Sequence, residues 1–396
     1  MSRRFALFSI LILSASAAEN PGITFDPYKH VIWIPVRING GPPLTFGFDS
    51  AAARSAIDWD RAEEMKLQFT DLGERLNRGS GDGATRAGRT GPVRVEIPGA
   101  RLDLPALGVV PLRGVSESYG RRMDGLIGAE LLSRYVVELD WEARRMAFHE
   151  PADYHYSGKG SAVPLIIAGG APYVRLEVSV PGAEPVEGIF LVDCPHPGTI
   201  IINRPFLEEH GLLEAAQKKL RRLVPHYAEG VGGRSAILYG RIAGLKIGPF
   251  TLGEPVVGFS QAHAGALAQS EFAGILGAEI LRRFRVVMDF SRERMILEPK
   301  AILADPFRFD ASGMRLRSAG ADLSECEVSS VVQDSPASRA GLRSGDRLIE
   351  VGGKPAAALG LGAILETLKR DGETVALKVR RGEETLNVPL PLRKLL

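Results

Sequence analysis

Two aspartates stand in matching settings, each at the end of an apolar run and at the start of a turn. They are Asp49 and Asp193, within residues 44–57 and 189–203. A buried carboxylate is costly unless hydrogen bonds or a function hold it there. In both stretches a hydroxyl residue follows the aspartate by six positions, Ser55 and Thr199. Two such carboxylates brought together would share a proton, which suits them to activate a water molecule for hydrolysis.

The first stretch resembles the active-site loop of the retropepsin-like and pepsin-like aspartic proteases. It reads Asp49-Ser50-Ala51-Ala52, with Ser55 and Ile57 following. The resemblance implies that Asp49 and Asp193 form a catalytic dyad, one from each of two facing lobes. The residues that would support the two turns are Ser50, Ala51, Cys194 and Pro195. In such a site neither a metal nor another cofactor is needed.

Both turns differ from the family's Asp-Thr/Ser-Gly pattern. Ala51 keeps the backbone N–H but adds a methyl group, whereas Pro195 has no N–H and removes one donor to Asp193. Cys194 is a weaker donor than the usual hydroxyl. Two functions therefore remain open. The first is an aspartic endopeptidase acting on unfolded protein in acidic to mildly acidic solution. The second is an eroded pseudoprotease that binds peptides in the same cleft.

The order of segments around Asp49 repeats around Asp193, which indicates an internal duplication. Each copy has a strand pair, the aspartate turn, a glycine-rich flap at Gly81 or Gly232, and an apolar strand that turns at glycine into a helix. We therefore expect a mainly β, two-lobed aspartic-protease-like fold. The expected divisions are a signal peptide at 1–18, lobe 1 at 19–155, lobe 2 at 156–298, a linker at 299–311 and a last domain at 312–396.

The last domain carries the run Ser335-Pro336-Ala337, then Ala340-Gly341-Leu342 and Gly345-Asp346-Arg347. This run closely resembles the PDZ domains of bacterial type. The resemblance implies a groove that binds peptide C-termini or extended strands. The groove residues would be Gly313, Met314 and Leu316, with backbone N–H groups taking the terminal carboxylate.

Several other polar residues near these motifs favour structural roles. Glu130 and Glu279 each begin a predicted helix, where a carboxylate complements the helix dipole. Asp140 and Asp289 close the last strand of each lobe, and His196 is interpreted as a histidine at the rim of the cleft. Cys194 and Cys326 fall in different domains, so we expect two free thiols.

The remaining features concern export and partners. Residues 1–18 carry two arginines, a short apolar run and small residues, the pattern of a secretory signal peptide. We therefore expect a periplasmic or secreted protein with no transmembrane segment after cleavage. The formal charge is +2 over 396 residues, without a long basic run, so nucleic acid is not expected as a partner. The expected partner is a polypeptide substrate.

Overall fold

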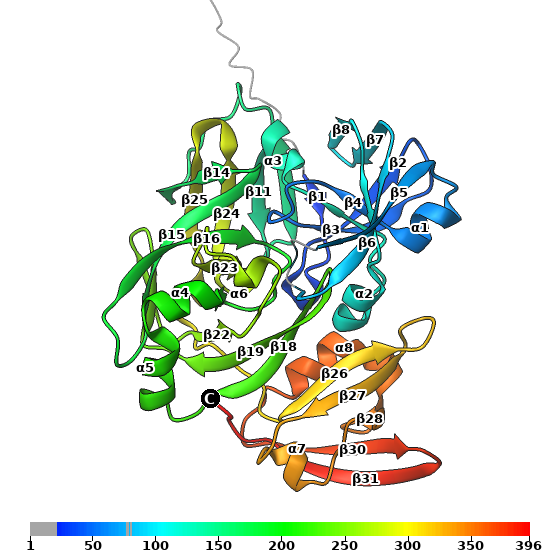
Figure 1. Ribbon diagram of the computed structural model, residues 1–396, viewed down its shortest axis with the longest axis vertical. Helices are drawn as coiled ribbons and strands as arrows, with labels where there is room; N and C mark the ends of the chain where they lie inside the picture. The colour runs from blue at the N-terminus through cyan, green and yellow to red at the C-terminus, as the bar shows by residue number, and fades with distance from the viewer. Residues whose placement is uncertain (1–21, 77–78, 80) are drawn as a thin grey trace, which may run out of the picture.

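The computed structural model describes residues 22–76, 79 and 81–396. Figure 1 shows a mainly β molecule, which confirms the predicted fold class. The described strands form four sheets, and two of these sheets have the same architecture. The predicted signal peptide at 1–18 lies outside the described residues.

The sheet of the first lobe has the strand order β5-β6-β9-β4-β10-β3-β2-β7-β8. Apolar residues alternate along strand β7, as in a sheet with one buried face. Val93, Val95 and Ile97 are buried, whereas Arg94 is exposed. The bounds are β2 Trp33–Ile38, β3 Leu44–Phe48, β4 Ala56–Asp58, β5 Phe69–Leu76, β6 Ala84–Thr90, β7 Val93–Ile97, β8 Ala100–Leu104, β9 Gly108–Val110 and β10 Gly125–Ile127.

The sheet of the second lobe has the order β18-β19-β22-β17-β23-β16-β15-β20-β21, with β14 paired to β15. Every position in this order matches one in the first lobe, including the parallel pairs β3–β10 and β16–β23. The bounds are β14 Ile166–Ala168, β15 Ala171–Ser179, β16 Val186–Asp193, β17 Ile200–Ile202, β18 Val224–Gly230, β19 Gly233–Arg241, β20 Gly244–Ile247, β21 Phe250–Gly253, β22 Val256–Ser260 and β23 Gly274–Gly277.

A third sheet joins the two lobes in the order β1-β12-β11-β24-β25-β13. Its central pair, β11 and β24, is antiparallel and aligns Val137 with Met288. One hydrophobic cluster includes Phe46 of the first lobe and Phe284 of the second, so the lobes share a core. The bounds are β1 Ile23–Thr24, β11 Val136–Asp140, β12 Arg145–His149, β13 Ser161–Pro164, β24 Phe284–Asp289 and β25 Arg294–Pro299.

Short helices connect these strands. They are α1 Trp59–Glu64, α2 Arg113–Tyr119, α3 Glu130–Arg134, α4 Arg204–Glu209, α5 Leu212–Lys219 and α6 Ala278–Leu281, with 3-10 turns η1 Tyr28–His30, η2 Ala266–Ala268, η3 Phe290–Arg292 and η4 Ala301–Ala304. The sequence predicts one helix over 207–223, which is wrong. Gly211 takes a left-handed φ of 62° between α4 and α5, and a continuous helix cannot pass through that conformation. No helix in the described part of the chain is long and apolar enough to cross a membrane.

The C-terminal domain has its own core and a sheet ordered β26-β27-β28-β30-β31, with β29 paired to β28. Strand β26 is therefore an edge strand. The bounds are β26 Met314–Ala319, β27 Glu325–Val331, β28 Arg347–Val351, β29 Lys354–Pro355, β30 Thr374–Arg381 and β31 Glu384–Pro391, with helices α7 Pro336–Arg339 and α8 Ala356–Thr367.

This domain docks on the first lobe, where Figure 1 shows α2 beside α8 and β26. The Tyr28 hydroxyl accepts a hydrogen bond of 2.8 Å from the Gly362 N–H of α8. Arg113 of α2 donates to the carbonyls of Gly320 and Ala321 at the end of β26. These contacts hold the edge of the C-terminal sheet close to the space between the two lobes.

Candidate active site

Asp49 follows β3, and two consecutive amides of its own turn bind its carboxylate. The N–H groups of Ala51 and Ala52 each donate to Oδ1 at 3.0 Å. The Asp49 N–H in turn donates to the Ile127 carbonyl of β10 at 2.8 Å. The methyl group of Ala51 therefore does not prevent the turn from closing on its aspartate.

A second layer of contacts holds this turn. The Ser55 hydroxyl donates to Glu130 Oε2 at 2.6 Å and accepts from the Gly128 N–H at 2.9 Å. A Cβ on Gly128 would lie 2.6 Å from the Ala52 carbonyl oxygen, so only glycine permits this close approach. The structural role predicted for Glu130 is an interaction with the helix dipole. In the structure Glu130 also accepts hydrogen bonds from Ser55.

Asp193 ends β16, and its turn supplies one amide where the first turn supplies two. The His196 N–H donates to Asp193 Oδ1 at 3.0 Å, while Pro195 has no N–H to donate. Gly277 crosses this turn as Gly128 crosses the other: a Cβ there would lie 2.4 Å from the Gly198 carbonyl oxygen. The donor difference that the sequence indicates is therefore present in the structure.

The two turns are in direct contact through Ser50. Its buried hydroxyl donates to the Val192 carbonyl at 2.6 Å and accepts from the Cys194 N–H at 3.1 Å. These two partners flank Asp193 in sequence, so Ser50 of one lobe braces the aspartate turn of the other. Cys194 is also fully buried, and both it and Cys326 are free thiols, as predicted.

Burial raises the pKa of both carboxyl groups, and the charge of Asp49 raises that of Asp193 further. The pKa of Asp49 rises to about 6 because burial outweighs the stabilising amides of Ala52 and Ala51. The pKa of Asp193 rises well above its usual value, first through burial and then through the negative charge of Asp49, against one amide. Asp49 is therefore the member that ionises first, and Asp193 is the member that keeps its proton.

Both carboxyl groups line a cavity of about 1200 Å³. Its wall comes from both lobes, from the segment after β25 and from β26 and α8 of the C-terminal domain. Apolar residues such as Leu126, Leu191 and Ile275 lie among the polar ones. A concave space whose wall combines apolar surface with polar and charged side chains is typical of a substrate site.

The glycine-rich hairpins of the two lobes meet. The N–H groups of Gly81 and Gly83 donate to the carbonyls of Val231 and Gly232, at 3.2 and 2.8 Å. The Ser235 hydroxyl donates to Asp82 at 2.7 Å beside this contact. Gly81 and Gly232, both predicted as flap residues, thus touch each other rather than lying apart.

His196 is not a rim residue that simply faces solvent. Its Nε2 is buried and has no hydrogen-bond partner among the described residues, and burial lowers its pKa to about 4. The ring is therefore neutral near pH 7. Its link to Asp193 runs through the backbone N–H and not through an imidazole–carboxylate pair.

Tyr119 of α2 is a site residue that the sequence interpretation missed. Its hydroxyl donates to the Pro195 carbonyl at 2.8 Å, and the negative charges of Asp193 and Asp49 help burial to raise its pKa. The ring packs edge-on against Trp33, with centroids 5.8 Å apart. No local signal marks this tyrosine, because the contact joins residues 76 positions apart.

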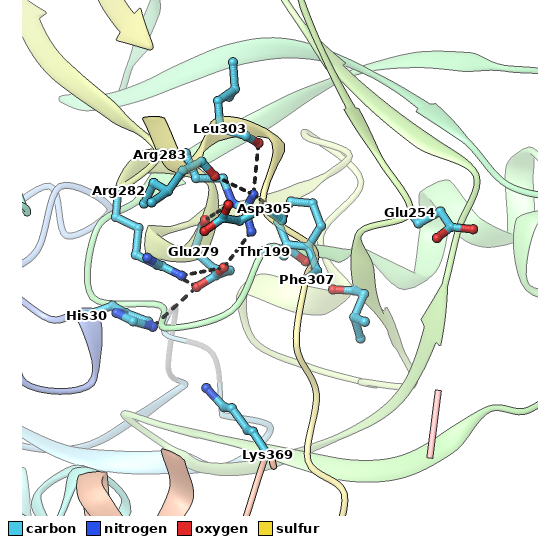
Figure 2. A network of polar contacts seen from close by, with 12 residues as sticks. His30, Thr199, Glu254, Glu279, Arg282, Arg283, Leu303, Asp305, Phe307 and Lys369 are labelled. Carbon is cyan, nitrogen blue, oxygen red and sulfur yellow. Dashed lines mark hydrogen bonds and ion pairs between the residues drawn. The ribbon is translucent and has the colours of Figure 1, made fainter. Parts of the chain in front are cut away.

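Glu279 holds a network that ties the first lobe, the second lobe and the segment 299–311 together (Figure 2). It binds Arg282 at 2.7 Å, Arg283 at 3.1 Å and His30 of the first lobe at 3.3 Å. The buried Arg283 donates to three carbonyls of the segment expected to be a linker, and its guanidinium lies 3.7 Å from the centre of the Phe307 ring. Those carbonyls belong to Ile302, Leu303 and Asp305. This part of the linker is therefore fixed to lobe 2.

Comparison with protein-family models finds two matches. Residues 34–131 match an aspartyl protease family, and residues 327–381 match the PDZ domain. The chain contains an aspartyl protease domain and a PDZ domain. Within the protease domain the match includes Asp49, Ser55 and Gly128, so it covers the first aspartate turn and the glycine that crosses it.

Among the solved structures that resemble parts of the chain are a PDZ domain and a processing protease. A search of curated proteins found no match. The HtrA3 PDZ domain bound to a phage-derived ligand (FGRWV) is 26% identical over 21% of this chain and 83% of that chain, with a TM-score of 0.19. The photosystem II D1 C-terminal processing protease is 21% identical over 22% of this chain, with a TM-score of 0.21. The match spans 24% of the processing protease.

The loop of the PDZ domain predicted to bind a carboxylate already holds one of its own. Asp310 accepts hydrogen bonds from the Ser312 N–H at 3.0 Å, the Ser312 hydroxyl at 2.6 Å and the Gly313 N–H at 2.7 Å. The Met314 N–H donates to the Ser312 hydroxyl at 3.0 Å. The N–H groups of Gly313 and Met314 are thus occupied, which differs from the expectation, whereas Leu316 lines the cavity.

No group of three or more histidine, cysteine, aspartate or glutamate side chains is placed to hold a metal ion in the described part of the chain. The predicted absence of a metal and of other cofactors remains a prediction.

Proposed function

We propose that this protein is an aspartic endopeptidase that hydrolyses peptide bonds with Asp49 and Asp193. The observation that carries the proposal is the pair of facing turns: Ser50 bridges them, and their partly buried carboxyl groups have unequal donors. Unequal donors separate the two pKa values, so one group can serve as base while the other serves as acid. The cavity that both carboxyl groups line would take the polypeptide.

In the proposed reaction a water molecule lies between the two carboxyl groups. Asp49 takes a proton from this water as the water oxygen bonds to the scissile carbon, and the Asp193 carboxylic acid protonates the carbonyl oxygen. The C–N bond of the resulting diol then breaks. The leaving nitrogen takes the proton held by Asp49, and one diol hydroxyl returns its proton to Asp193.

The test is cleavage of an unfolded protein by the full chain, followed from acidic to neutral pH. We expect Asp49→Asn to lower the rate by about a hundredfold or more, the usual loss when a general base is removed. A matched control is Asp153→Asn, which neutralises an exposed aspartate outside the cavity. Full activity in Asp49→Asn, or an equal loss in both variants, would exclude the dyad.

A peptide-binding pseudoprotease is the second candidate, and Pro195 is the observation that favours it. With one amide fewer, the second turn departs from the pattern of the aspartic proteases. If the wild-type chain cleaves nothing across this pH range yet binds extended peptides, the second candidate replaces the first.

We further propose that the two lobes arose by internal duplication and that the protein is exported. The shared strand order of the two lobe sheets supports the duplication. The pattern of residues 1–18 supports export to the periplasm or beyond. A mature chain whose N-terminal sequencing begins at Glu19 would agree with export, and an intact Met1 on the purified native protein would contradict it.

A further inference from the structure

The carboxylate loop of the PDZ domain has little capacity for a second carboxylate. Asp310 fills it, with both carboxylate oxygens accepting from the loop. A peptide terminus entering there would have to displace Asp310 or face its negative charge. A carboxylate on the bound polypeptide therefore needs a different partner.

Arg315 offers such a partner two positions further along, on the edge strand β26. The preceding residue, Met314, is buried in the core of the PDZ domain, whereas Arg315 lines the cavity that contains the aspartates. Its Nε and Nη2 atoms are buried and have no hydrogen-bond partner among the described residues. A buried guanidinium without a partner is costly, so this position favours an anion.

The surroundings of Arg315 do not neutralise it. Asp310 is the acidic group near enough to raise the pKa of Arg315 against the effect of burial, but its carboxylate is engaged by Ser312 and Gly313. The centre of the Phe309 ring lies 5.6 Å from the guanidinium carbon. Neighbouring His226 is held neutral by burial and by the charge of Arg315. The guanidinium fork thus remains available to a carboxylate.

We propose that Arg315 binds a carboxylate of the polypeptide held in the cavity, either its C-terminus or an acidic side chain. The PDZ domain then contributes a specificity residue to the wall of the protease cavity and does not capture termini in its own loop. This proposal rests on one part of the proposed function, that the cavity binds polypeptide. A binding measurement tests the proposal without requiring cleavage.

The experiment measures the binding of three fluorescent peptides to the full-length Asp49→Asn chain, which retains the cavity but is not expected to cleave. The peptides share one extended sequence without acidic side chains. One ends in a free carboxylate, one in an amide, and one in an amide but with a single internal glutamate. We expect Arg315→Gln to weaken binding of at least one carboxylate-bearing peptide about tenfold or more, and to leave the fully neutral amide within about twofold.

Two further variants keep the test decisive. Arg308→Gln removes the same charge from an exposed residue of the cavity wall. It should not selectively weaken the binding of the carboxylate-bearing peptides. Arg315→Lys keeps the charge but loses the fork, so it should recover part of the affinity if Arg315→Gln folds poorly.

The pattern of loss identifies the source of the carboxylate. Loss confined to the free acid identifies the C-terminus, and loss confined to the glutamate peptide identifies a side chain. The proposal is overturned if wild-type Arg315 gives no preference for a carboxylate, if all three peptides weaken equally, or if Arg308→Gln has the same effect. If the wild-type chain cleaves no substrate but still binds peptides in a carboxylate-dependent way, the proposed peptidase activity is wrong and this inference is still supported.

Discussion

The nitrogen of Pro195 accounts for the main difference between the two aspartate turns. Asp49 receives two amide hydrogen bonds from its turn, and Asp193 receives one. Each lost donor removes stabilisation from the ionised form, so the asymmetry favours Asp193 as the protonated member. Since the pKa of Asp49 is raised to about 6, the active form with one proton on the pair becomes dominant only above about pH 6. We therefore predict that any peptidase activity has its optimum nearer neutral pH than the family resemblance implies.

At this scale we predict the effect of restoring the family's turn with Cys194→Thr and Pro195→Gly. The added N–H should stabilise the Asp193 carboxylate and lower its pKa, so the alkaline side of the pH–rate profile should move to lower pH. Because Asp193 is the proposed proton donor, the pair should hold its single proton over a narrower pH range, and kcat/KM at neutral pH should fall. The measurement is kcat/KM against pH.

A suitable control is Cys194→Thr alone, which leaves the amide count of the turn unchanged. If the double variant folds normally and shows neither a loss of activity at neutral pH nor a shift of the pH–rate profile, the turn has been remodelled around Pro195. The unequal donors would then have no part in the chemistry.

At the scale of the elements, the contact between the two flap hairpins depends on glycine. A Cβ on Gly81 would lie 2.4 Å from the carbonyl carbon of Gly232, a separation that backbone atoms cannot accept. The tips of β5–β6 and β18–β19 can therefore close on each other only while this position is glycine. Closure of this kind excludes water and positions substrate.

We predict that Gly81→Ala separates the two tips and weakens catalysis through substrate positioning. A misplacement of about 1 Å can cost up to about a hundredfold in rate, and we expect kcat/KM to fall toward that limit. Hydrogen exchange of the Gly83 amide should rise, because its bond to Gly232 would be lost. Gly91→Ala is the control, since a Cβ at Gly91 meets nothing within 4 Å. Equal kinetics in the two variants would show that the flap contact is incidental.

For the whole molecule, one buried cation joins parts that are distant in sequence. Arg283 is 1% exposed and binds Glu279, which in turn contacts His30 of the first lobe. The same guanidinium fixes the start of the segment that leads to the PDZ domain. The position of that domain against the cavity thus depends on packing within lobe 2.

We predict that Arg283→Met lowers the free energy of unfolding by about 3–5 kcal/mol, because it leaves three carbonyls without their donor and removes one of the cations that bind Glu279. The matched control is Arg134→Met in the first lobe. Arg134 pairs with Glu150 at the surface, where an ion pair contributes about 0–1 kcal/mol. Urea denaturation of both variants gives the comparison. A loss below about 1 kcal/mol for Arg283→Met would show that the network is not required for stability.

The sequence alone determined the features that depend on local spacing and covalent chemistry. Apolar runs predicted the strands that lead to Asp49 and Asp193, the spacing from Asp49 to Ser55 predicted the aspartate turn, and the missing N–H of Pro195 followed from the proline ring itself. The roles of the two aspartates as catalytic groups remain predictions that the proposed kinetics would test.

Only the tertiary structure decided which distant groups meet. Tyr119 reaches Pro195 across 76 positions, and Ser50 reaches Val192 across 142, contacts for which the chain carries no local signal. The same holds for Arg315, since only the docking of the PDZ domain makes β26 part of the wall of the protease cavity. Asp310, by contrast, lies within three residues of its loop partners, yet its hydrogen bonds depend on backbone geometry that residue types do not specify. Long-range packing and exact backbone conformation are set by the folded chain as a whole, and local pattern does not encode them.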